Sequence, residues 1–198
     1  MSNSVERLYR FVEDLIPEGS CLLDLGCGDG SLLELLVKEK KVKGTGIDIS
    51  GTDLNKAMAK GLSVIQANID KGLQDYKSNS FDYVVLSYTL QELLKPALVV
   101  NEMLRVSKRA IVTFPNFGHW YIRFSLLLTG RMPKSKILPY EWHNTPNIHL
   151  LTIKDFKRFC RKRNIKVIQT YYFNSWSITL PSFLANLFAT HSVFVIKK

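Results

Sequence analysis

Three glycines and two aspartates in the first quarter of the chain have the types and spacing of a site for a flat, extended ligand. Asp24 lies near the end of an apolar run and is followed by Gly26, Gly28 and Gly30 at alternate positions. Glycine has no Cβ atom, so this turn can bend tightly and a ligand can approach its backbone closely. Asp48 lies at the end of a second apolar run. Its carboxylate can accept hydrogen bonds from both hydroxyls of a ribose.

The residue after the last of these glycines distinguishes two kinds of cofactor. A dinucleotide-binding turn prefers glycine at position 31, where it permits close helix packing beside a pyrophosphate, but this chain has Ser31. The pattern Gly-x-Gly-x-Gly preceded by an acidic residue instead resembles motif I of the class I S-adenosylmethionine-dependent methyltransferases. Ser31 and Glu34 also have the spacing of a capping box, which predicts that a helix begins there.

This resemblance implies that the cofactor is S-adenosylmethionine or S-adenosylhomocysteine. Asn68 stands where the family usually has aspartate, and its amide carbonyl can still accept a hydrogen bond from an adenine amino group. Ser87 and Tyr88 follow the fourth apolar run, where open α/β sheets place their ligands. Asp24 has an alternative role in bonding a loop, and Asp82 is interpreted as structural. The predicted cofactor-binding residues are Asp24, Gly26, Cys27, Gly28, Gly30, Asp48, Ile49, Asn68, Ile69 and Ser87.

Alternating strands and helices must position these residues. Short apolar runs predict strands at 21–25, 44–49, 62–67, 83–86 and 110–114, and two β-rich runs follow at 165–173 and 192–196. Helical spacing predicts helices at 5–16, 32–38, 54–60, 97–106 and 152–163. The alternation predicts a parallel sheet covered on both faces. Together with the resemblance to class I methyltransferases, it implies an α/β, Rossmann-like class I methyltransferase fold with seven mostly parallel strands, of which the last is antiparallel.

Composition favours one globular domain over residues 1–198. The chain is 46% hydrophobic and 22% charged, and it contains no apolar run of the roughly 18 residues that a membrane span requires. The first ten residues lack the pattern of an export signal. Cys21, Cys27 and Cys160 do not have the paired spacing of a disulfide framework or a zinc site. These features predict a cytoplasmic protein without a metal centre.

Positive charge gathers in the second half of the chain. The 27 basic and 17 acidic residues give a net charge of +10, of which residues 101–198 contribute +13 and residues 1–100 contribute −3. Such a surface attracts acidic partners or is simply well solvated. Nucleic acid is disfavoured as a substrate. The stretch 87–90 lacks the Pro-Pro motif of adenine N6 methyltransferases, and no cysteine between Cys27 and Cys160 can serve a cytosine C5 enzyme.

The stretch from Pro115 to Leu150 is a long insertion that holds four of the seven prolines, two of the three tryptophans and three of the four histidines. Insertions of this length in a compact domain are usually functional, so we expect a pocket lid or a docking segment. Its candidates for a general base are His119, Tyr140 and His143. Each can equally be a hydrogen-bonded structural residue, and no catalytic residue is assigned.

Several motifs outside the glycine turn are similar to those of the MetW family of methionine biosynthesis proteins. These motifs are residues 90–93, 102–106, 114–120, 130–133 and 144–149, and the similarity spans about residues 20 to 165. It implies a bacterial, cytoplasmic protein that associates with homoserine O-acyltransferase and activates it. The departures are Asn68 and the stretch 141–144, where an acidic residue is expected before Thr145. The alternative is an active methyltransferase whose small-molecule acceptor lies beneath the insertion.

Overall fold

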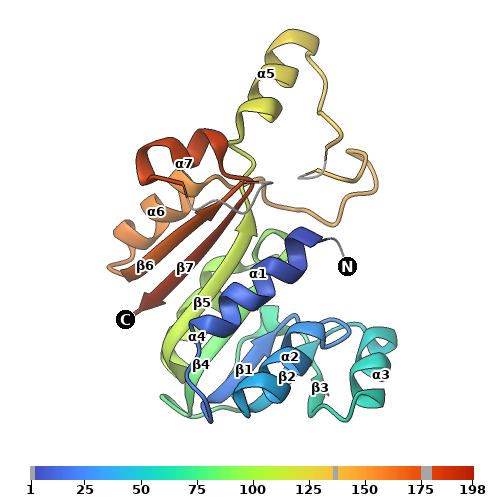
Figure 1. Cartoon of the computed structure of the whole chain (residues 1–198), viewed down its shortest axis with the longest axis vertical. Helices are drawn as coiled ribbons and strands as arrows, with labels where there is room; N and C mark the ends of the chain where they lie inside the picture. Colours follow the sequence, from blue (N-terminus) through green and yellow to red (C-terminus); the bar gives the residue numbers. More distant parts are fainter. Residues whose placement is uncertain (1–2, 136–137, 175–179) are drawn as a thin grey trace.

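Seven strands form one sheet in the order β3-β2-β1-β4-β5-β7-β6 (Figure 1). The computed structural model describes residues 3–135, 138–174 and 180–198. The first five strands are parallel to one another, whereas β7 is antiparallel to both of its neighbours, β5 and β6. The predicted sheet with an antiparallel last strand is therefore confirmed. The strands are β1 (Cys21–Leu25), β2 (Lys43–Asp48), β3 (Val64–Gln66), β4 (Phe81–Ser87), β5 (Ser107–Pro115), β6 (Lys166–Phe173) and β7 (His191–Lys197).

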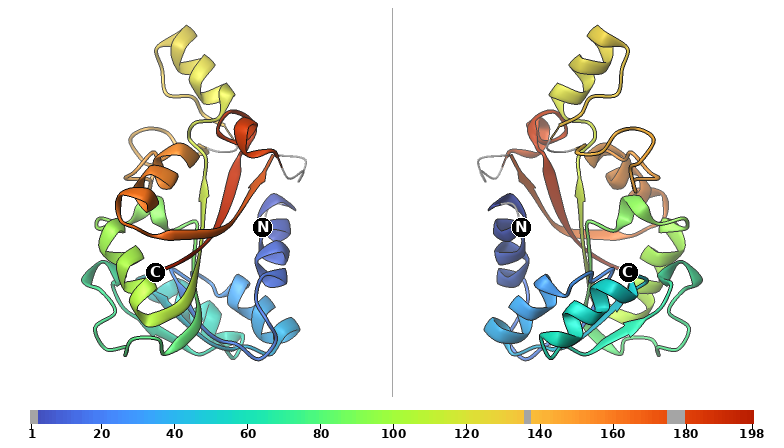
Figure 2. Two further views of the ribbon diagram at one scale, coloured as in Figure 1. Left: turned by 90° about the vertical axis from the view of Figure 1, so that its left-hand side faces the viewer. Right: turned by 90° about the vertical axis from the view of Figure 1, so that its right-hand side faces the viewer.

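Helices cover both faces of the sheet, as Figure 2 shows edge-on. One face carries α1 and α2, and the opposite face carries α4, α6 and α7. Two 3₁₀ turns, η1 (Ile69–Lys71) and η2 (Leu90–Glu92), lie in the connections on either side of β4. The helices are α1 (Asn3–Asp14), α2 (Ser31–Lys40), α3 (Gly51–Ala59), α4 (Pro96–Val106), α5 (Trp120–Thr129), α6 (Ile153–Lys162) and α7 (Ser182–Phe188).

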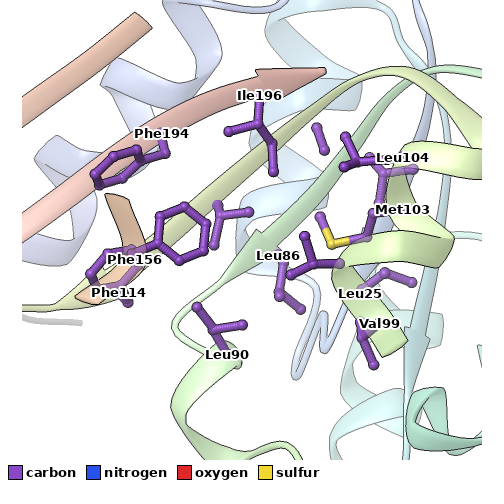
Figure 3. Packing of buried hydrophobic residues seen from close by; sticks show 14 of the residues in the cluster. Leu25, Leu86, Leu90, Val99, Met103, Leu104, Phe114, Phe156, Phe194 and Ile196 are labelled. Atoms are coloured by element: carbon purple, nitrogen blue, oxygen red, sulfur yellow. The ribbon is translucent and has the colours of Figure 1, made fainter. Parts of the chain in front are cut away.

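The buried strands alternate their side chains between two cores. In β4, Val84 and Leu86 pack toward α4 and α6, whereas Tyr83 and Val85 pack toward α1 and α2. In the first core Phe114 stacks on Phe194 with ring centroids 5.6 Å apart (Figure 3). Burial of each large apolar side chain stabilises the fold by about 1.5–3 kcal/mol. These two cores fix the central strands, whose ends carry the predicted site.

The structure differs from the sequence-based expectations at four places. The capping box at Ser31 is wrong: α2 is capped by Gly30 in the left-handed region, because the Ser31 hydroxyl donates to Asp29 Oδ1 at 2.7 Å and Glu34 pairs with Lys38. The edge strand β3 is shorter than predicted. Two helices, α5 and α7, were not predicted, and α5 lies inside the long insertion.

Within the described ranges, no helix is long and apolar enough to span a membrane.

Candidate functional site

The site lies where β1 and β4 run side by side and their connections leave in opposite directions. The chain crosses from β1 through β2 to β3 on one side and continues from β4 to β5 on the other. Ligands of open α/β sheets bind in the crevice beyond the carboxyl ends of the strands at such a point. The loops that follow β1, β2 and β4 therefore meet at this edge, and they carry most of the predicted cofactor residues.

The glycine turn has the backbone that only glycine adopts easily. Gly26, Gly28 and Gly30 have φ angles of 70°, 53° and 73°. A Cβ atom on Gly26 would lie 2.3 Å from the Thr89 hydroxyl oxygen, so this glycine permits close packing against the loop after β4. A Cβ atom on Gly28 would meet nothing within 4 Å. The backbone at Gly28 therefore borders open space, where a ligand can lie against it.

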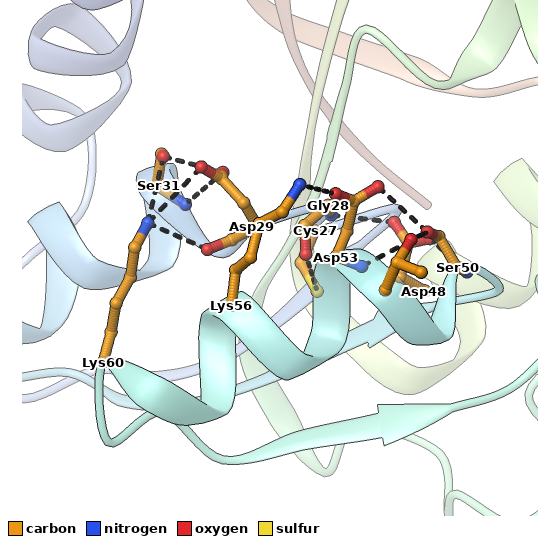
Figure 4. Close-up of polar contacts among 10 residues, drawn as sticks. Cys27, Gly28, Asp29, Ser31, Asp48, Ser50, Asp53, Lys56 and Lys60 are labelled. Atoms are coloured by element: carbon orange, nitrogen blue, oxygen red, sulfur yellow. Dashed lines mark hydrogen bonds and ion pairs between the residues drawn. The ribbon is translucent and has the colours of Figure 1, made fainter.

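Asp48 is held in one orientation by two backbone groups (Figure 4). Its Oδ2 atom accepts a hydrogen bond from the Gly28 N–H at 2.7 Å, and its Oδ1 atom accepts one from the Ser50 N–H at 2.8 Å. A carboxylate has about four acceptor positions, so two remain for hydroxyl donors of a ligand. The end of β2 is thus joined directly to the glycine turn.

Asp24 is the unusual group of the site. Its side chain is buried at 1% exposure, and its Oδ2 atom has no hydrogen-bond partner within the part of the chain that the structure describes. Burial, and secondarily the charge of Asp48, raises the pKa of Asp24 from 3.8 to about 7. A buried carboxylate without a partner is energetically costly, and such groups are typical of functional sites. A cationic ligand group would offset that cost.

The other predicted cofactor residues lie around this pair in different environments. Ile49 is 66% exposed directly after Asp48, whereas Ile69 is buried in the core. The Asn68 carbonyl oxygen accepts from the Asp70 N–H at 2.9 Å, so one of its two acceptor positions is already used. Ser87 shares a 3.0 Å hydrogen bond with the Thr113 hydroxyl. The Cys27 side chain is buried, and burial raises the pKa of its thiol to about 12, so the thiol is protonated.

Two aromatic residues extend the site beyond the glycine turn. Tyr88 follows β4 with a φ angle of 55°, and its buried hydroxyl has no hydrogen-bond partner within the described residues. Its ring meets His191 edge to face at 5.5 Å. The Nδ1 atom of His191 also lacks a partner among the described residues. Burial, and secondarily His119, lowers the pKa of His191 to about 4, so its imidazole is neutral.

Sequence reasoning missed His191 as part of this region, and also Tyr9 of α1. Burial, together with the charges of Asp24 and Asp29, raises the pKa of Tyr9, which shows that this side chain lies near the glycine turn. Neither residue belongs to a motif. His191 is the first residue of β7, which runs antiparallel to β5 and therefore starts beside the carboxyl end of β5. An expected antiparallel last strand is thus the one signal that could have placed His191 near the site.

The three candidates for a general base have different surroundings. His119 is partly buried, and its Nδ1 atom accepts from the Tyr121 N–H at 3.3 Å, so this residue caps α5. Burial lowers the pKa of His119. Tyr140 and His143 are exposed in the stretch that follows α5. No hydrogen bond or ring contact between described residues joins these two to the glycine turn.

The comparisons with known proteins agree with this architecture. A bifunctional methionine biosynthesis protein MetXA/MetW of Rhodopirellula baltica is 33% identical over 81% of the chain, and the chain spans 27% of that protein. A demethylmenaquinone methyltransferase of Geobacillus stearothermophilus is 28% identical over 64% of the chain and 62% of its own length. The crystal structure of a SAM dependent methyltransferase from Archaeoglobus fulgidus superposes with a TM-score of 0.70 at 16% identity, covering 98% of the chain and 94% of that structure.

The structural likeness establishes a class I methyltransferase fold, and a family match is more specific. The family described as methionine biosynthesis protein MetW matches residues 7–196, which is nearly the whole chain. The sequence motifs that resembled this family lie within the matched region. The chain therefore belongs to the MetW family of methionine biosynthesis proteins.

Proposed function

We propose that this protein binds S-adenosylmethionine or S-adenosylhomocysteine at the glycine turn and, in that form, associates with homoserine O-acyltransferase and activates it. The observation that carries the cofactor assignment is the buried Asp24 carboxyl group, whose Oδ2 atom has no partner among the described residues, together with the open space beside Gly28. The partner assignment is supported by the relative that joins MetXA and MetW in one polypeptide. A cytoplasmic location belongs to the proposal and agrees with three cysteines that form no disulfide.

The residues of the site fit this cofactor in charge and in hydrogen bonding. Asp48 would accept from the ribose hydroxyls, and Gly28 would let the cofactor pass close to the backbone. Asp24 would face the positive charge of the cofactor, which carries an ammonium and, in S-adenosylmethionine, a sulfonium. Ile49, Asn68 and Ile69 would surround the adenine. When bound, the sulfonium supplies an electrophilic methyl group.

The cofactor would regulate the acyltransferase if the active and inactive forms of the complex bind it with different affinities. S-adenosylmethionine is made from methionine, so its concentration reports on the end product of the pathway. A ligand that binds the active and inactive complexes unequally shifts the balance between them, and the partner changes the affinity for the ligand by the same factor. This role requires binding of the cofactor but no turnover.

Direct binding tests the cofactor assignment. Calorimetric titration of S-adenosylmethionine and S-adenosylhomocysteine should give saturable binding to the wild type. Asp48→Ala should weaken it strongly, because both hydrogen bonds that order the loop and both free acceptor positions are lost. Asp75→Ala, at an exposed aspartate in the connection before β4, is the matched control and should bind normally. Equal affinity of the Asp48 variant and the wild type would contradict the assignment.

An active methyltransferase with a small-molecule acceptor is the second candidate. It is favoured by the buried Tyr88 hydroxyl and by Nδ1 of the neutral His191, because neither atom has a partner among the described residues and the two rings are in contact just after β4. A neutral imidazole can take a proton from a hydroxyl or amine acceptor. The two candidates differ in the activity that Asp48→Ala should remove. An enzyme would lose methyl transfer to its acceptor, whereas the proposed activator would lose the cofactor-dependent activation of the acyltransferase. Activation that survives in this variant would indicate a scaffold that needs no cofactor.

A further inference from the structure

Helix α5 leaves the body of the protein and projects beyond the edge of the sheet (Figures 1 and 2). Of its ten residues only Ile122 is buried. Leu127 and Leu128, near its far end, are 77% and 78% exposed. Single exposed apolar side chains are normal on protein surfaces, but contiguous groups of them mark sites of interaction.

Four of the six exposed apolar side chains of α5 lie on one side of the helix; Tyr121 borders this side, and Leu126 lies on the opposite one. Trp120, Phe124, Leu127 and Leu128 are spaced i, i+4, i+7 and i+8, which places them along a single stripe. We call these four residues the α5 stripe. Trp120 and Phe124 already contact each other edge to face, with ring centroids 6.3 Å apart. This spacing is the one by which a helix fills an apolar groove on a partner protein.

The base of α5 is firmly attached, although the helix itself projects. The fully buried Asn116 donates from Nδ2 to the carbonyl of Ala189 at 2.8 Å and accepts at Oδ1 from the Gly118 N–H at 3.0 Å. Arg123 of α5 donates to the carbonyls of Gly118 and Asn186. A helix fixed at its base in this way is preorganised for docking, which reduces the entropy that binding removes.

The charge of the chain, and the fusion of two proteins in one relative, indicate which partner the stripe contacts. Two copies of this chain would each carry a net charge of +10, so electrostatic repulsion disfavours self-association. A lipid surface is also disfavoured, because the single cation of α5, Arg123, already binds two backbone carbonyls rather than lying free for headgroups. In the bifunctional relative the MetXA and MetW parts share one polypeptide, which keeps the two parts close to each other.

We propose that α5 is a docking arm that lays its stripe into an apolar groove with an acidic rim on homoserine O-acyltransferase. This inference rests on the partner proposed above and names the surface by which that partner is held. The stripe supplies the buried centre of the interface, and the exposed Arg131, directly after the helix, supplies positive charge at its rim.

The test compares a double substitution in the stripe with a single control substitution elsewhere, both made in the full-length chain. Leu127→Asp combined with Leu128→Asp should weaken the complex with homoserine O-acyltransferase from the same cell by about 100-fold, the loss expected when two buried leucines become charged. Leu94→Asp, at a leucine that is 68% exposed before α4, is the matched control and should leave the affinity unchanged. Affinities are measured by calorimetry or sedimentation, and both variants should still bind S-adenosylmethionine like the wild type.

Four other outcomes would each contradict the proposal in a different way. If the wild type forms no complex with the acyltransferase, the proposed partner is wrong and the docking surface falls with it. If the complex forms and the double variant binds equally well, the partner stands and the docking arm is refuted. A wild type that dimerises while the double variant is monomeric would assign the stripe to a second copy. Binding of the wild type alone to anionic phospholipid vesicles would assign it to a membrane.

Discussion

Asp24→Asn should stabilise the protein at alkaline pH and leave its stability almost unchanged in acid. The substitution keeps the shape of the side chain and removes its charge. In the wild type, burial and Asp48 raise the pKa of Asp24 from 3.8 to about 7. The folded state therefore binds this proton more tightly than the unfolded state does. Stability that is present below pH 4 is lost as the pH rises toward 7 and the buried carboxylate must ionise.

The magnitude follows from the two pKa values. Each tenfold difference in proton affinity corresponds to about 1.4 kcal/mol, so the full penalty above pH 7 is about 4 kcal/mol. Part of it is already present at pH 5, where the unfolded carboxyl is ionised and the folded one is not. Between pH 5 and pH 8 the free energy of unfolding of the variant, relative to that of the wild type, should increase by about 2.5 kcal/mol.

Urea denaturation at the two pH values measures this difference. Asp82→Asn is the matched control, because Asp82 accepts hydrogen bonds from Lys108 at 2.7 Å and from the Cys21 N–H at 3.0 Å. Lys108 holds the pKa of Asp82 below its usual value, so neutralising it should give no stabilisation as the pH rises. A relative stability of the Asp24 variant that is independent of pH would refute the claim that burial and Asp48 raise the pKa of Asp24.

Three further predictions use other parts of the structure. A cationic cofactor that pairs with Asp24 must displace its proton, so the affinity for S-adenosylmethionine should fall by about tenfold from pH 8 to pH 6 in calorimetry, and a flat profile would separate the cofactor from Asp24. Charge reversal at Arg158 and Arg161 on α6 should slow association with an acidic acyltransferase surface in stopped-flow measurements, whereas reversal at the exposed Lys43 and Lys77 should not; equal rates would remove α6 from the encounter. Asn116→Ala should lower the free energy of unfolding by about 3 kcal/mol, because buried carbonyls near α7 lose their donor, and a loss below 1 kcal/mol would contradict that role.

The central strands were predictable because their burial depends on their own residues. Continuous apolar runs such as those of β1 and β4 are buried on both faces, so their pattern alone indicates a strand. β3 lies at the edge, with Ile65 46% exposed, and its weaker pattern left its ends undefined. Helix α5 was missed for the opposite reason. Its apolar residues face solvent rather than the core, so the usual relation between apolar spacing and burial fails there.

The site was predictable only where a motif carries it. The glycines and Asp48 follow one another at characteristic spacing, and the structure joins the two loops by a hydrogen bond between Gly28 and Asp48. Tyr9 and His191 reach the same region from the two ends of the chain. Their approach depends on how α1 and β7 pack on the sheet, which no local pattern encodes. The wrong capping box at Ser31 shows the same limit, because Asp29 competes for its hydroxyl.

The most direct test of the account measures the rate of homoserine O-acyltransferase from the same cell with and without this protein. Each condition is repeated with S-adenosylmethionine and with S-adenosylhomocysteine. The account predicts that the protein raises the rate and that the cofactor changes the size of this effect. An unchanged rate on addition of the protein, under every cofactor condition, would contradict it.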